Sequence, residues 1–162
     1  MMASTAAPLL VDVQFALLKE TQAPSREQLS IWAELAALQS IDQASEVTIR
    51  LVHKSEITKL NEQYRGKHGA SNVLSFPIDE KDIINIDLLS HRPLGDVIIC
   101  HDVVVSEAKL QGKTVLEHYA HMVTHGILHL CGYDHIEEHE ALEMEALEVA
   151  ALARSEIANP YK

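Results

Sequence analysis

Four segments of the chain carry the hydrophobic pattern of β-strands. In EVTIRLVH, residues 46–53, the apolar residues Val47, Ile49 and Leu51 alternate with polar ones, so one face of a strand would be buried. The other three are short segments of β-type composition, and Pro77 ends one of them. We therefore predict strands over residues 9–18, 46–53, 73–77 and 94–100.

Five other segments repeat apolar residues at helical spacing. In residues 24–39, for example, Leu29, Trp32 and Ala36 fall on one side of a helix. Residues 79–93 are predicted to be an exposed loop that holds at most a helical turn. The last predicted helix is amphipathic, with acidic residues on its outer face. The remaining helices are predicted over residues 54–65, 102–112, 114–130 and 136–157.

Capping residues indicate where several of these helices begin and end. In a capping box, a Ser or Thr and a Glu or Gln three residues later satisfy each other's backbone N–H groups. Two pairs have this spacing: Ser25 with Gln28, and Thr114 with Glu117. Ser55 is the predicted cap of helix 54–65, and Gly112 the predicted stop of helix 102–112. Strands and helices follow one another along the chain, which predicts the α/β class.

The composition is that of one folded domain. The chain has 162 residues, of which 47% are hydrophobic, and shows neither internal repeats nor a low-complexity linker. We therefore predict a single domain over residues 1–162. The net charge of −11 argues against a general nucleic-acid coat protein, although it is compatible with a local basic groove. Cys100 and Cys131 form no CxxC pair and are expected to be packed thiols in a reducing cytosol.

Export and membrane insertion are not expected from the sequence. The first residues, MMASTAAPLL, lack a basic region and contain only a short apolar run, so we expect no signal peptide. No apolar run reaches the ~18 residues that a membrane span needs. We therefore expect no membrane partner.

The segment HGILHLCGYDH, residues 125–135, carries the strongest chemical signal. His125 and His129 are four residues apart, so both imidazoles lie on one face of the predicted helix. Gly132 can end that helix in a left-handed conformation, which allows His135 to turn back toward the other two. This pattern predicts one metal ion held by three histidines with a coordination position left open, as in catalytic zinc sites. Zinc is the expected metal, and another divalent ion is compatible with these ligands.

Gly126 occupies the position at which zinc peptidases of the HExxH type place their catalytic glutamate. Because glycine cannot accept a proton from an attacking water, peptide hydrolysis is disfavoured. Cleavage of an RNA phosphodiester is less demanding, since a 2′-hydroxyl or a metal hydroxide can attack. Asp134 is interpreted equally well as a base, as a hydrogen-bond acceptor for an imidazole, or as a turn residue.

His118 and His121 lie upstream on the same predicted helix. His121 is one turn before His125 and could contact a ligand or substrate. For both residues, a buried histidine hydrogen-bonded to the backbone is the favoured interpretation.

Basic residues gather in one part of this acidic chain. Residues 50–67 contain five basic residues against two glutamates, whereas residues 137–148 contain six glutamates. This polarity could steer a phosphate backbone toward one face. For Lys54 and Lys59 an ordinary solvated helix surface is the favoured interpretation. Arg65 stands in the glycine-containing stretch YRGKHGASN, where a bidentate contact with phosphate is one of two open interpretations.

The segment HGILHLCGYDH resembles the signature of the YbeY family of bacterial rRNA maturation factors, H-G-x-L-H-L-x-G-Y-D-H. LNEQYRGKHGASNVLSFP and LGDVIIC are also similar to family segments, so the resemblance spans residues from about 60 to 135. His68 stands where the family usually has aspartate, and Ser71 where threonine is common. Both departures lie in a predicted loop and concern substrate contacts rather than the metal.

The resemblance implies more than the residues show by themselves. It implies an α/β (α+β) fold with a small mixed sheet of about four strands, about five helices and a zincin-like metal helix. It implies one zinc ion on His125, His129 and His135, and a functional arginine at Arg65. Family members are single-strand-specific endoribonucleases that act in 16S rRNA 3′-end maturation and ribosome quality control. A cytoplasmic location and ribosomal partners would follow.

Together these observations predict a metal-dependent endoribonuclease. Arg65 would hold the scissile phosphate, and Lys67, Asn72 and His121 would contribute to the RNA groove. Two alternatives remain open: a zinc hydrolase of another substrate class, and a non-catalytic ribosome-associated factor whose metal is structural.

Overall fold

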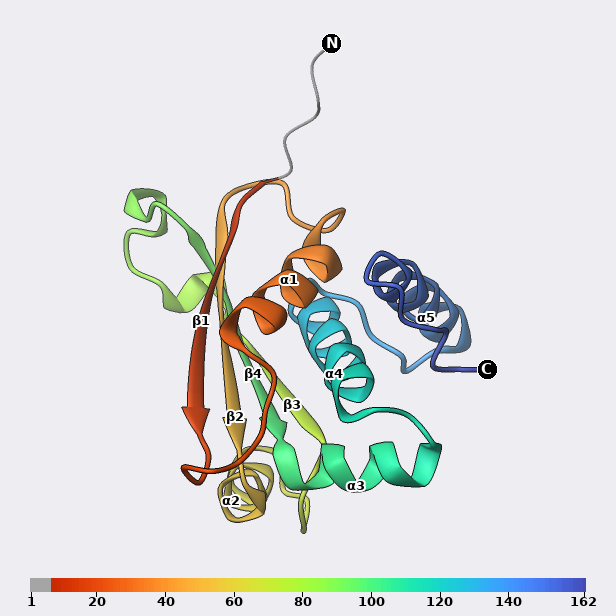
Figure 1. The fold of residues 1–162 in the computed structure, drawn as a ribbon. Coiled ribbons are helices and arrows are strands. Elements are labelled where there is room, and N and C mark those ends of the chain that lie inside the picture. Colours follow the sequence, from red (N-terminus) through yellow and green to blue (C-terminus); the bar gives the residue numbers. More distant parts are fainter. Residues whose placement is uncertain (1–6) are drawn as a thin grey trace.

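A small mixed sheet forms the centre of the structure, a computed structural model that describes residues 7–162. Its strands are β1 (Leu9–Ala16), β2 (Ser45–Val52), β3 (Val73–Pro77) and β4 (Arg92–Cys100). Within the described range they form one four-stranded sheet in the order β1-β2-β4-β3 (Figure 1). β1, β2 and β4 run parallel, and β3 lies antiparallel to β4 at the edge of the sheet.

Helices connect the strands and cover the sheet. Across residues 7–162 there are five α-helices and two short 3₁₀ turns, Glu80–Asp82 and Ile86–Leu88, in the loop before β4. The predicted fold class, an α+β protein with about four strands and about five helices, is therefore confirmed; the zincin-like character of the metal helix stays a prediction. The α-helices are α1 (Arg26–Ala37), α2 (Lys54–Arg65), α3 (His101–Gln111), α4 (Val115–Leu130) and α5 (Glu138–Ala153).

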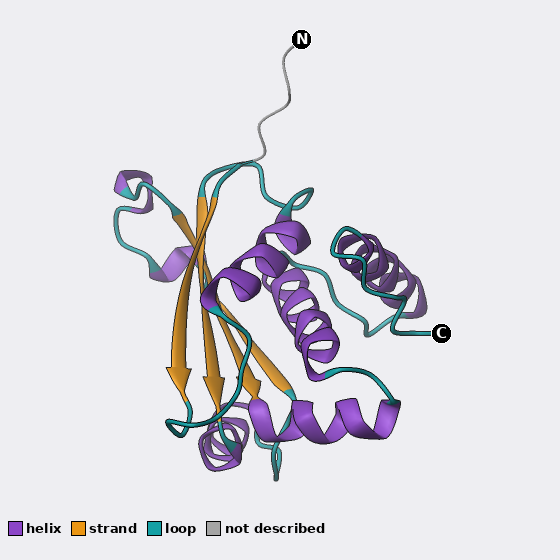
Figure 2. Ribbon diagram, in the orientation of Figure 1, coloured by secondary structure: helices purple, strands orange, loops and turns teal. Residues whose placement is uncertain are grey.

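The larger hydrophobic core lies between the sheet and helices α1 and α4, which pack on the same face of the sheet (Figure 2). Val47, Ile49 and Leu51 all belong to this core, as the alternation along β2 predicted. A smaller cluster, which includes Ile57 of α2 and Ile98 of β4, lies on the other face. Helix α5 packs against α1 and α4 rather than against the sheet.

Tertiary hydrogen bonds explain why two strands have bounds that differ from the prediction. β1 ends at Ala16, earlier than predicted, because the chain turns and the Leu18 N–H donates to Nε2 of His53 at 3.0 Å. β4 begins at Arg92, earlier than predicted, because the Arg92 N–H donates to the Ala44 carbonyl at 2.8 Å. Both bonds join segments far apart in the sequence, so local patterns do not reveal them.

Two helices are capped at their N-termini by residues next to them in the sequence, and one by a residue from another helix. The two predicted capping boxes are present at the starts of α1 and α4. The predicted cap Ser55 is wrong: α2 begins at Lys54, with His53 as the N-cap residue. The Lys54 N–H donates instead to Oδ2 of Asp102 in α3, at 2.8 Å. The Asp102 side chain thus satisfies an N-terminal N–H group of α2 that a local cap residue would otherwise satisfy.

The expectation of no signal peptide concerns residues 1–10, of which residues 1–6 lie outside the described part. Among the helices of the described residues, none is both long and apolar enough to cross a lipid bilayer.

Candidate metal centre

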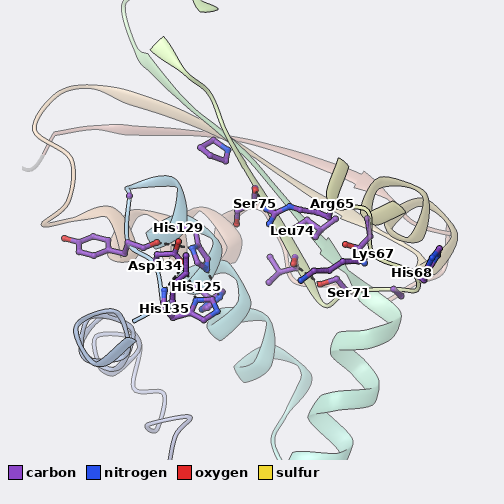
Figure 3. Close-up of a pocket in the computed structure, with 17 residues that line it drawn as sticks. Arg65, Lys67, His68, Ser71, Leu74, Ser75, His125, His129, Asp134 and His135 are labelled. Atoms are coloured by element: carbon purple, nitrogen blue, oxygen red, sulfur yellow. Dashed lines mark hydrogen bonds and ion pairs between the residues drawn. The ribbon is translucent and has the colours of Figure 1, made fainter. Parts of the chain in front are cut away.

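The predicted ligand histidines lie at the C-terminal end of α4 and in the turn that follows. His125 and His129 are one turn apart on α4, which ends at Leu130. Gly132 has a φ of 101°, a left-handed conformation that favours glycine, and its N–H donates to the His129 carbonyl at 3.0 Å. The chain turns sharply at this glycine, and His135 comes to lie beside the other two imidazoles (Figure 3).

The three imidazoles converge on a common point. One nitrogen of each ring lies within 4.8 Å of the corresponding nitrogens of the others. Nε2 of His125 and Nε2 of His129 are 3.0 Å apart. The His135 ring centroid lies 5.5 Å from that of His125 and 5.2 Å from that of His129. This spacing suits three imidazole nitrogens that bind one metal ion at about 2.0–2.1 Å each.

The outward-facing nitrogens of two of these rings are held by oxygen acceptors. Nδ1 of His125 donates to Oε1 of Glu148 at 2.7 Å, and Nδ1 of His129 donates to the Tyr133 carbonyl at 3.0 Å. With Nδ1 protonated, each neutral ring turns an unprotonated Nε2 toward the cluster. Burial, followed by the nearby His125 and His135, lowers the pKa of His129 and favours its neutral form. These residues therefore fit a divalent cation.

Glu148 of α5 lies beside His125, on the Nδ1 side of its ring. Its side chain is 1% exposed and accepts hydrogen bonds from His125, from Nε2 of His121 at 2.9 Å, and from the Tyr161 hydroxyl. Burial raises the pKa of this carboxyl, but the three hydrogen bonds outweigh burial and lower it to about 2. The prediction that the acidic residues of this helix lie on its outer face is wrong for Glu148. The sequence does carry a signal for this burial, because the apolar residues Met144, Ala151 and Leu152 stand three or four residues from Glu148 and share its face of the helix.

A cleft of about 820 Å³ opens in front of the histidines. One wall comes from α2, β3 and the loop between them, and the other from the end of α4 and the turn after it. Arg65 and Lys67 line the first wall, and Asp134 lines the second (Figure 3). Oδ1 of Asp134 accepts a hydrogen bond from the His135 N–H at 2.7 Å, so this carboxylate both shapes the turn and faces the cleft.

Arg65 is fixed at the last turn of α2, facing the edge of the sheet. Its Nη2 donates to the Ser75 carbonyl at 2.8 Å, and its guanidinium carbon lies 5.8 Å from the centre of the Phe76 ring. Among the described residues it makes no ion pair with a carboxylate. The guanidinium group is therefore oriented by β3 while its other N–H groups remain available to an anion.

Two residues that were predicted to contact the substrate, Asn72 and His121, lie outside the cleft. Nδ2 of Asn72 donates to Oε1 of Glu107 at 3.1 Å, and neither Asn72 nor His121 lines the cleft. The expected backbone bonds of His118 and His121 are wrong, because both imidazoles bond to buried or half-buried carboxylates. Nε2 of His118 bonds to Glu107 at 2.8 Å, while His121 bonds to Glu148. A role for Asn72 or His121 in RNA contact stays a prediction.

Fewer basic residues face the cleft than the basic segment 50–67 indicated. Arg50 is paired with Glu56 at 2.6 Å, and this bond raises the pKa of Arg50. Lys54 and Lys59 do not line the cleft. Arg65 and Lys67 therefore provide the positive charge that faces the histidines.

Fold and site together define a class of protein: a small α+β protein in which the end of one helix gathers three imidazoles beside a cleft with basic residues on its far wall. Comparisons with known proteins agree with this description. Residues 17–156 match the family model described as endoribonuclease YbeY. The endoribonuclease YbeY of Colwellia psychrerythraea is 45% identical over 155 residues, which cover 94% of this chain and 96% of that protein.

A Thermotoga maritima protein whose solution structure has been determined shares the fold, with a TM-score of 0.58 and 23% sequence identity. The match covers 94% of this chain and 96% of that one. The extent of the family match and the identity to the Colwellia protein are decisive: the chain belongs to the endoribonuclease YbeY family.

Proposed function

We propose that this protein is a zinc-dependent endoribonuclease that cleaves single-stranded RNA in the cleft between Arg65 and the three histidines. The observation that carries the proposal is the convergence of His125, His129 and His135 opposite a basic wall. Membership of the YbeY family supports RNA as the substrate. One domain would carry the whole activity, since both walls of the cleft belong to the same sheet-and-helix unit.

The residues of the cleft have separable roles in this proposal. Arg65 would hold a phosphate oxygen through a bidentate contact, and Lys67 would add positive charge along the backbone. Asn72 and His121 were predicted to contribute to the RNA groove, but they hydrogen-bond to Glu107 and Glu148 and lie outside the cleft, so this proposal gives them no contact with RNA. A zinc ion bound to the histidines would lower the pKa of a bound water and polarise the phosphoryl group. Other divalent metals also bind three imidazoles, so elemental analysis of the purified protein identifies the native ion.

The cellular role that we propose follows from the family. It comprises maturation of the 16S rRNA 3′ end and ribosome quality control, in the cytoplasm and with ribosomal proteins as partners. Gly126 disfavours the alternative of a peptide hydrolase, because it offers no base. A non-catalytic factor with a structural metal would bind RNA and leave it intact.

Cleavage of a labelled single-stranded RNA tests the proposal. We expect chelator treatment and His129→Ala to abolish cleavage, and Arg65→Ala to reduce it by about 10²-fold or more, as for loss of a group that stabilises transition-state charge. Lys59→Ala is the matched control, because Lys59 is an exposed basic residue of α2 outside the cleft. Full activity of His129→Ala, or intact RNA with zinc-loaded wild-type protein, would contradict the proposal.

A further inference from the structure

The carboxylate of Glu148 accepts hydrogen bonds from three side chains. Oε1 faces Nδ1 of His125 at 2.7 Å, and Oε2 faces Nε2 of His121 at 2.9 Å and the Tyr161 hydroxyl. The side chain is 1% exposed. A buried carboxylate is costly unless it is fully hydrogen-bonded, so this arrangement fixes the group in one orientation.

We infer that Glu148 is a positioning residue for His125, and that it selects the tautomer of His125 that can bind the metal. The inference rests on the proposed metal-binding role of the histidines. An ionised carboxylate only accepts hydrogen bonds, so Nδ1 of His125 must carry the proton and Nε2 must be free. Without Glu148, the neutral ring can protonate Nε2 instead, or rotate away from His129, and the cluster loses one ligand.

Two further side chains hold the carboxylate itself. His121 reaches it from α4, one turn before His125, and Tyr161 reaches it from the segment after α5. Nδ1 of His121 is buried and has no hydrogen-bond partner among the described residues, so the ring is oriented through Nε2, which bonds to Glu148 and lies 3.3 Å from the Tyr161 hydroxyl. The structure thus links His121 to the metal centre through Glu148, and not through the RNA cleft.

Zinc affinity distinguishes this role from a purely structural one. We expect Glu148→Met, which removes both carboxylate oxygens, to weaken zinc binding by about 10–100-fold, the usual effect of losing an acceptor behind a ligand histidine. The affinity is measured on the metal-free protein by competition with a fluorescent zinc chelator, after circular dichroism has established folding. Glu143→Met is the matched control, because Glu143 is an exposed residue of the same helix. A loss of less than tenfold in folded Glu148→Met would overturn the inference.

The tautomer of His125 can also be observed without a variant. In metal-free wild-type protein above pH 8, long-range ¹H–¹⁵N spectra should show His125 protonated at Nδ1. Protonation at Nε2 would overturn the inference, even if Glu148→Met did not fold. Failure of the proposed function has a different signature: wild-type protein that binds zinc but leaves RNA intact refutes the endoribonuclease proposal and leaves the role of Glu148 standing.

Discussion

Gly126 lies where α4 packs tightly on the sheet. A Cβ atom at this position would lie 2.6 Å from Cγ1 of Val97, a fully buried residue of β4. The Gly126 carbonyl also accepts a hydrogen bond from Oγ of Ser75 at 3.3 Å. The close packing of α4 on the sheet therefore explains why this position carries no base. A glutamate side chain here would have to enter the core.

Restoration of the peptidase motif by Gly126→Glu should therefore destabilise the protein severely. A buried carboxylate without partners adds desolvation to steric overlap, so we expect the free energy of unfolding to fall by more than about 3 kcal/mol. Gly126→Ala should cost less, since overpacking of about 1–3 kcal/mol is partly offset by the higher helix propensity of alanine. Urea denaturation measures both. A Gly126→Glu protein as stable as the wild type would show that α4 can move away from Val97.

At the scale of elements, the sequence predicted helix ends correctly where they depend on contacts between residues close together in the chain. Both capping boxes formed as predicted because each needs only residues three positions apart. The cap of α2 and the bounds of β1 and β4 depend on side chains and carbonyls from distant segments, such as Asp102, and these were missed. Helix α5 shows the same limit: its acidic pattern predicted an outer face, whereas tertiary packing buried Glu148.

The capping box of α4 offers a direct test at this scale, because α4 carries the metal ligands. Oγ1 of Thr114 accepts from the Glu117 N–H at 3.1 Å, and Glu117 accepts from the Thr114 N–H at 2.9 Å. We expect Thr114→Ala to lower the free energy of unfolding by about 1 kcal/mol and to leave zinc affinity unchanged, since the histidines lie at the other end of the helix. Chemical denaturation and chelator competition measure the two quantities. Weaker zinc binding would show that α4 transmits strain along its length.

For the molecule as a whole, the sequence predicted the fold class and the gathering of the three histidines. Their spacing needs only a helix and a turn, which His125, His129 and Gly132 specify locally. The second layer of the site could not be predicted, because Glu148 and Tyr161 reach it only after α5 has packed on α4. The position of Asn72 was missed for the same reason: its partner Glu107 lies on α3, far from Asn72 in the sequence.

Buried histidines make the stability of the whole protein depend on pH. Burial lowers the pKa of His101, His118 and His129, so the unfolded chain binds protons more readily than the folded one. Their stabilising effect is complete above the unfolded pKa of about 6.5 and is lost as the pH falls below it. We therefore expect the metal-free protein to become less stable in urea between pH 7.5 and pH 5.5.

Two variants test whether buried histidines cause this pH dependence. His118→Gln should weaken it, while His68→Gln should leave it unchanged, because the His68 side chain is 96% exposed. Stability that is constant over this range would contradict the assignment.

The bond between Arg65 and the Ser75 carbonyl has a further consequence. Within residues 7–162, β3 has a neighbour in the sheet on one side only, β4, and the guanidinium covers part of its other side. An uncovered strand edge invites a second polypeptide to extend the sheet. Arg65→Ala would therefore promote self-association in concentrated solution in addition to losing a phosphate contact. The activity of Arg65→Ala should therefore be measured at low protein concentration. Arg65→Lys, which retains a long cationic side chain over the strand, is the variant to compare it with.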